Sequence, residues 1–115
     1  MFGKLASETI PQSVPTVVYT APSDAVITIL LSNTDMYPTG YSIAITAAAA
    51  PAISDYIKYN AVLGPAQNPN TSSIQTEKIA LSPGEKIIIT TDSPFVNARI
   101  SGVDGVDLTT ARYSF

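Results

Sequence analysis

The side chains that most often catalyse reactions or bind metal ions are largely missing from this sequence. Its 115 residues contain no cysteine and no histidine. This excludes thiolate nucleophiles, Ser-His and Cys-His catalysis, disulfide bonds and every zinc site other than an all-carboxylate one. No Ser-x-x-Lys motif and no glycine-rich phosphate loop occurs either. What remains for chemistry is nine acidic residues, six tyrosines and the hydroxyl groups of serine and threonine.

Most of the acidic residues lie in turn-forming stretches, where capping and solvation are the ordinary use of a carboxylate. Two carboxylates about 5–10 Å apart can hydrolyse a glycosidic bond, but nothing in the spacing singles out such a pair. The stretches Asn33-Thr-Asp35 and Asp104-Gly-Val-Asp107 resemble fragments of a calcium-binding loop and lack its closing glutamate. We therefore predict no enzyme activity, no catalytic residue, no metal site and no cofactor.

The six tyrosines are the remaining candidates for recognition. A cluster of tyrosines can bind a sugar, but tyrosine is also an ordinary residue of strands and protein interfaces. We favour the core or an interface. A glycan-binding or receptor-binding domain, in which the tyrosines and the loop at 64–72 contact a sugar, stays open as an alternative.

The charge balance excludes several classes of partner. Six basic residues are scattered along the chain, and the net charge is -3. Clustered lysines and arginines supply most of the affinity for nucleic acid or for an acidic membrane, so neither partner is expected. Lys4 and Glu8 interrupt the apolar core that a signal peptide would need, and prolines and a glycine interrupt the longest uncharged stretch, 36–54. We expect a soluble protein with no small-molecule substrate.

The elements that must position these residues are short strands. The sequence is rich in Ile, Val, Thr and Tyr, and its nine prolines recur about every ten residues, which leaves no room for a long helix. Ser82-Pro-Gly-Glu85 fits a type II turn, because glycine accepts a positive φ at its third position. We predict strands over 16–20, 25–32, 41–48, 55–63, 73–81, 86–91 and 95–103, with an eighth over 108–115.

Seven or eight short strands at this spacing predict an all-β fold, a single antiparallel β-sandwich of jelly-roll or immunoglobulin-like Greek-key type. Apolar residues on both faces of 25–32 indicate a central strand that is covered on both sides, or one whose outer face meets a partner chain. The predicted core consists of Val18, Ile27, Ile29, Ile43, Ile45, Ile79, Ile87, Ile89, Val96 and Ile100.

The two ends of the chain carry apolar residues that a free end has little reason to keep. Because Pro11 and Pro15 disfavour regular pairing, we predict an extended N-terminal arm over 1–15 that lies across a neighbouring subunit, followed by a sandwich domain over 16–115. The alternative, in which both ends fold back onto their own core, stays open. The predicted partner interface consists of Phe2, Leu5, Ile10, Tyr37, Tyr56, Tyr59, Tyr113 and Phe115.

Three stretches together resemble a family of small β-rich virion proteins of tailed bacteriophages, including those of cyanobacteria. They are Lys4-Leu-Ala6 leading to Thr16-Val-Val-Tyr-Thr-Ala-Pro22, then Ile29-Leu-Leu-Ser-Asn33, then Asp55-Tyr-Ile-Lys-Tyr59 running through Ser82-Pro-Gly-Glu-Lys86 to Ser101-Gly102. In that family a Tyr-Thr-x-Pro edge opens the sandwich, an Asn ends the next strand, and a turn with Gly-Glu or Gly-Asp precedes a closing strand. The loop at 64–72 and the residues beyond Val103 depart from the pattern.

The resemblance implies a structural component of the virion without catalytic activity. The first expectation is a capsid cement or decoration protein, made in the host cytoplasm and located on the capsid surface. Its partners would be the major capsid protein and other virion subunits, and it would form trimers or dimers on the particle. The runner-up is a tail, neck or fibre-base subunit. Only 13% of the residues are charged, against about a quarter in ordinary soluble domains, so much of the surface is expected to be covered by other subunits.

Overall fold

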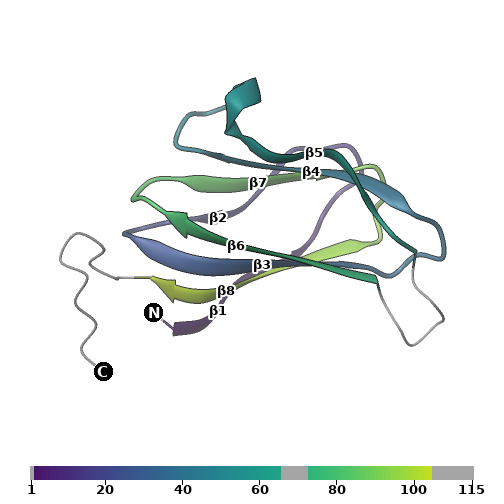
Figure 1. Ribbon diagram of the computed structural model, residues 1–115, viewed down its shortest axis with the longest axis horizontal. Helices are drawn as coiled ribbons and strands as arrows, with labels where there is room; N and C mark the ends of the chain where they lie inside the picture. The colour runs from purple at the N-terminus through teal and green to yellow at the C-terminus, as the bar shows by residue number, and fades with distance from the viewer. Residues whose placement is uncertain (1, 66–72, 105–115) are drawn as a thin grey trace.

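The computed structural model of the chain describes residues 2–65 and 73–104. Within these residues the chain forms eight strands and one short 3-10 helix. The strands build two four-stranded antiparallel sheets that pack face to face as two layers (Figure 1). The expected all-β antiparallel sandwich is confirmed.

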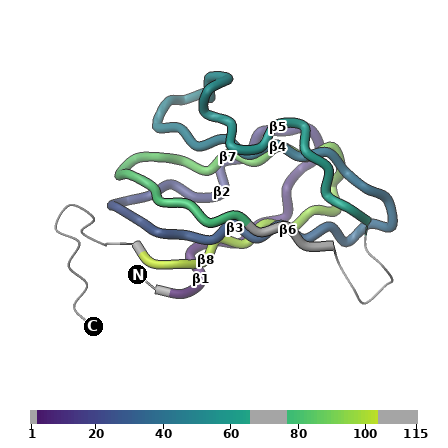
Figure 2. Tube along the Cα trace, viewed as in Figure 1, coloured from purple at the N-terminus to yellow at the C-terminus, as the bar shows by residue number. Residues whose placement is uncertain are grey.

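Sheet A has the strand order β1-β8-β3-β6, and sheet B has the order β2-β7-β4-β5. Consecutive strands lie in different sheets, except β4 and β5, which are both in sheet B (Figure 2). The strands of sheet A are β1 (Phe2–Thr9), β8 (Val96–Asp104), β3 (Ala25–Asn33) and β6 (Ser73–Leu81). Those of sheet B are β2 (Thr16–Thr20), β7 (Lys86–Thr91), β4 (Thr39–Thr46) and β5 (Tyr56–Leu63), with helix η1 (Ile53–Asp55) before β5.

The seven strands expected between residues 16 and 103 are all present, with ends within two residues of the predicted ones. Alternating apolar residues and proline-marked turns locate strands well, because both signals act within a few residues of chain. The expected turn at 82–85 is also present, and Gly84 there has a φ of 85°. The eighth strand expected over 108–115 lies outside the described residues.

The N-terminal segment differs from the extended arm that was expected over residues 1–15. From Phe2 to Thr9 it forms β1, which pairs antiparallel with β8 of the same chain. Ile10 follows, fully buried, and its N–H donates to the carbonyl of Val96 at 2.9 Å. Pro11 and Pro15 lie beyond the strand, in the crossover to β2, so they remove no hydrogen bond from sheet A. The sandwich therefore includes this segment.

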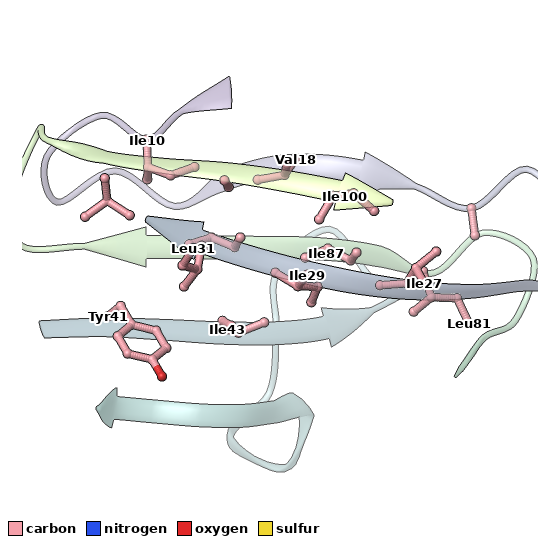
Figure 3. Packing of buried hydrophobic residues seen from close by; sticks show 14 of the residues in the cluster. Ile10, Val18, Ile27, Ile29, Leu31, Tyr41, Ile43, Leu81, Ile87 and Ile100 are labelled. Carbon is pink, nitrogen blue, oxygen red and sulfur yellow. The ribbon is translucent and has the colours of Figure 1, made fainter. Parts of the chain in front are cut away.

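The core lies between the sheets and is built mainly from isoleucine and leucine side chains of the central strands (Figure 3). Eight of the ten predicted core residues are buried, and Ile45 and Ile79 are partly buried. Strand β3 is central in sheet A, but its residues alternate between buried and more exposed, and Val26 on its outer face is 43% exposed. The expectation of a strand covered on both faces within this chain was wrong. The alternative, an outer face that meets a partner, stays a prediction.

Candidate functional site

The described part of the chain contains no cluster of three or more acidic residues that could hold a metal ion. No helix among the described residues is long and apolar enough to cross a membrane. Three surfaces of the described structure stand out: the residues predicted as an interface, one end of the sandwich, and the outer face of sheet A.

The structure places the predicted interface residues in different parts of the molecule. Ile10 is fully buried in the core, and Leu5 packs against the core from β1. Tyr37 is 74% exposed in the loop between β3 and β4. Tyr56 and Tyr59 lie together on β5, with ring centroids 5.0 Å apart and ring planes at 80°. Of the others, Phe2 lies in β1, and Tyr113 and Phe115 lie outside the described residues.

Five exposed large apolar residues belong to segments at the end of the sandwich where β3 leads into β4 and β7 leads into β8; this end of the sandwich is on the right in Figure 1. Each is at least half exposed, from 50% for Val14 to 74% for Tyr37. We call this set the loop-end patch; it consists of Val14, Met36, Tyr37, Val62 and Phe95.

Sequence reasoning identified only Tyr37 in the loop-end patch. The other four members come from the β1–β2 crossover, the same loop as Tyr37, strand β5 and the segment before β8. They are far apart in sequence, and no local pattern marks them as a group. Only the pairing of strands across the sandwich brings them to one end.

A buried asparagine fixes the β3–β4 part of the loop-end patch. Asn33 is fully buried at the end of β3. Its side-chain amide donates to the carbonyls of Tyr37 and Gly64, each at 2.9 Å, and its Oδ1 accepts from the N–H of Asp35 at 2.9 Å. This side chain therefore joins the loop to the end of β5 and closes the turn that the sequence predicted at this position.

The remaining parts of the loop-end patch are held by backbone groups. The N–H and hydroxyl of Thr34 both donate to the carbonyl of Phe95, at 3.1 and 2.8 Å. The N–H of Ser13 donates to the carbonyl of Thr91 at 2.7 Å, which places the neighbouring Val14 beside the end of β7. Four of the five exposed apolar residues thus lie on loops tied to the strands, and Val62 lies on β5 itself, which is the arrangement that a preformed contact surface needs.

The outer face of sheet A carries a shallow open groove of about 350 Å³. Leu30 of β3, half-buried, contributes apolar surface to it, and hydroxyl and amide side chains border it. Glu8 also borders the groove, from the edge strand β1. The residues that line the groove also include Ser7, Thr9, Leu30, Ser32, Asn97 and Arg99.

The tyrosines within residues 2–65 and 73–104 do not form one platform for a sugar. Tyr37 lies in the β3–β4 loop, Tyr56 and Tyr59 lie on β5, and the buried Tyr41 belongs to the core. The groove on sheet A contains no aromatic side chain among its lining residues. No observation in the described residues favours the glycan-binding alternative.

No protein-family model and no curated protein sequence matches the chain. Among solved structures, the chain is similar to two crystal structures of a pentameric capsid protein isolated from metagenomic phage sequences. In both comparisons the sequence identity is 11%, the TM-score is 0.47 and 87% of this chain is covered. The chain spans 63% and 62% of the length of those two proteins.

Proposed function

We propose that this protein is a non-enzymatic structural subunit of a bacteriophage virion, and specifically a capsid cement or decoration protein that binds the major capsid shell. The observation that carries the proposal is the loop-end patch, where five large apolar side chains are at least half exposed, four of them on hydrogen-bonded loops and Val62 on strand β5. Several large apolar side chains that stay exposed at one end of a domain are typical of a surface that another protein covers.

The motifs that resemble the phage virion family support the proposal by their positions. The Tyr-Thr-x-Pro motif at 19–22 ends β2, which is an edge strand of sheet B. Asn33 ends β3, the motif at 55–59 leads into β5, and the turn at 82–85 precedes β7. Because β1 precedes them, Asn33 ends the third strand of the structure and the Tyr-Thr-x-Pro motif does not open the sandwich, so the support comes from the order of the motifs along the chain.

The proposed mechanism is the addition of many weak contacts over a repeating shell. Each copy would contribute a small interface, and repetition on a symmetric particle would multiply its effect. Because residues 2–9 pair within sheet A, we assign the contact with the major capsid protein to the sandwich surface and not to a free arm. Trimeric or dimeric clusters on the outside of the particle fit this proposal.

The test is the binding of the purified protein to expanded phage heads that lack it. We expect wild-type protein to bind the heads, and we expect the double variant M36S/Y37A to bind at least about tenfold more weakly. The matched control is Ile53→Ser, which removes a side chain 83% exposed on η1, away from the loop-end patch. Failure of the wild-type protein to bind heads would overturn the cement assignment. Binding to tails or necks in place of heads would support the runner-up, a tail, neck or fibre-base subunit.

A further inference from the structure

We propose that the outer face of sheet A binds the loop end of a second copy of this chain, in a head-to-tail contact. The inference concerns self-association. It is an alternative use of the loop-end patch to the shell contact proposed above, and its test does not involve the shell. It is carried by two surfaces of opposite charge, each of which offers apolar area to the other.

The first surface is basic. Thr28 of β3 points away from the core, because the residues before and after it are buried. By strand register it lies in one row with Lys78 of β6, Ser101 of β8 and Lys4 of β1. Since neighbouring strands are about 4.8 Å apart, the backbones of the two lysines are separated by roughly 14 Å across the sheet.

Arg99 adds a third positive charge to the same face, one outward position further along β8. All three basic side chains are exposed. Among the side chains that the structure describes, one carboxylate borders this face: Glu8, which is exposed on the edge strand β1, lines the groove and pairs by register with the inward-facing Ala98. The three basic side chains outnumber it. The fold therefore gathers basic residues that are scattered in the sequence onto a single face.

The second surface is acidic. The described loops that carry the loop-end patch contain two charged side chains, Asp35 and Asp92, and no basic one. Asp92 is exposed, and Asp35 is partly exposed. The apolar side chains around them would lose contact with water on binding, while the two carboxylates would approach the basic face of the other copy.

The groove on sheet A gives the contact a specific anchor. It combines the apolar surface of Leu30 with hydroxyl and amide groups, which is the mixture that a tyrosine side chain needs at an interface. Tyr37 is the most exposed aromatic residue at the loop end, at 74%. We assign it to this groove, with Asp92 directed toward the basic residues beside the groove.

The chemistry favours a protein surface over a nucleic acid as the occupant of this face. Three cations spread over roughly 14 Å are few for binding a polyanion such as nucleic acid, and the net charge of -3 on the whole protein repels a polyanion at long range.

Because the two surfaces are different, a contact between identical copies is heterologous. Such a contact closes into a ring or extends into a chain, and each copy uses both of its surfaces.

The experiment measures self-association of the full chain by sedimentation velocity and native mass spectrometry over a range of protein and salt concentrations. We expect concentration-dependent oligomers that dissociate as salt is raised, since screening weakens exposed charge contacts. The face variant K78E/R99E should weaken association about tenfold or more, and so should the loop-end variant D35N/D92K. In the second variant, Asn at position 35 keeps the side-chain oxygen that accepts the N–H of Met36.

Mixing the two variants supplies the decisive comparison. In the mixture, the acidic face of K78E/R99E can bind the basic loop end of D35N/D92K. The original acidic loop end of K78E/R99E can bind the original basic face of D35N/D92K. We therefore expect the mixture to associate as wild type does. The matched controls Thr20→Glu and Asp24→Lys change charge on β2 and on the β2–β3 turn, and they should leave association unchanged.

Three results would overturn the inference: a wild-type protein that stays monomeric at all concentrations, variants that associate normally, or a mixture that does not associate. Loss of binding to a single-stranded DNA oligonucleotide in K78E/R99E, with unchanged self-association, would identify the face as a polyanion site instead. Binding to phage heads is measured separately, so failure here and failure of the proposed function are distinguishable.

Discussion

The ammonium group of Lys58 on β5 lies 3.3 Å from the Oε1 atom of Glu77 on β6, and this ion pair joins the two sheets where both strands are at an edge. Beside it, the ring of Tyr41 is only 3% exposed and packs into the core (Figure 3). Burial raises the pKa of the Tyr41 hydroxyl above its ordinary value of 10.0; the Lys58 charge lowers that pKa, and the Glu77 charge raises it. This side of the core is thus closed by a neutral phenol next to a charged pair.

The first prediction is that the protein loses stability above about pH 10 through Tyr41. A hydroxyl whose folded pKa is raised binds its proton more tightly in the folded state than in the unfolded state. Its contribution is therefore fully present below the unfolded pKa and is lost as the pH rises through the folded pKa. The measurement is the free energy of unfolding by denaturant as a function of pH, for wild type and for Tyr41→Phe.

Because lysines also titrate in this range, the comparison between the two proteins is what tests the prediction. Tyr41→Phe should show a shallower decline above about pH 10 than wild type. Identical slopes for the two proteins would contradict the prediction. Tyr37→Phe, at an exposed position, serves as the control for loss of a phenol.

The second prediction concerns Asn33, whose amide serves two carbonyls. Replacement by alanine leaves those carbonyls and the Asp35 N–H without this partner in a buried place, which should cost about 1–3 kcal/mol of unfolding free energy. The matched control is Asn97→Ala, since Asn97 is exposed and accepts a hydrogen bond from Thr9 at the surface. Chemical denaturation measures both. Equal, small effects would mean that the loop end is not held by Asn33.

Much of the fold could be predicted from the sequence, because its signals are local. The alternation in 41–48 and the proline and glycine turns around 21–24 and 82–85 act over a few residues, and the corresponding strands are present. Strand β1 was missed because nothing local distinguishes it from an arm. Its partner β8 is about a hundred residues away along the chain, as the pairing of Phe2 with Val103 illustrates.

The surfaces could be predicted only in part. Tyr37 stands out as a large aromatic in a polar turn, but Ile10 looks equally exposed in a proline-flanked segment and is buried. The basic face was not predicted, since Lys4, Lys78 and Arg99 come from three separate strands and are aligned only by register. Sequence reveals which side chains alternate along one strand, whereas a surface depends on which strands are neighbours.

The third prediction separates two residues that the sequence placed in the same interface. Ile10→Ala should lower the free energy of unfolding by about 2–5 kcal/mol, because it removes a fully buried side chain from the core. Tyr37→Ala should change it by less than about 0.5 kcal/mol, because Tyr37 is 74% exposed. Thermal and urea unfolding of dilute protein measure both effects. If Ile10→Ala unfolds with the same free energy as wild type, the N-terminal segment is a free arm and Ile10 is not part of the core.

The fourth prediction concerns Gly102, where β8 passes between β1 and β3. Its φ is 146°, and a β-carbon there would overlap the carbonyl oxygen of Val26 and lie 2.7 Å from the Cα of Ile27. Because both obstacles are backbone atoms of a central strand, they cannot move aside cheaply. We expect Gly102→Ala to cost about 3 kcal/mol or more of unfolding free energy.

The matched control for Gly102 is Gly84→Ala in the β6–β7 turn. Gly84 also has a positive φ, 85°, but a β-carbon there would meet no atom within 4 Å. Only backbone strain remains, so the expected cost is about 1 kcal/mol. Urea unfolding of both variants measures the difference, which isolates the steric contribution. If the two substitutions lower the unfolding free energy equally, the close approach of β3 to β8 at Gly102 does not constrain the sheet. The row of paired residues Gly3, Gly102 and Ile27 would then have room for a side chain at position 102.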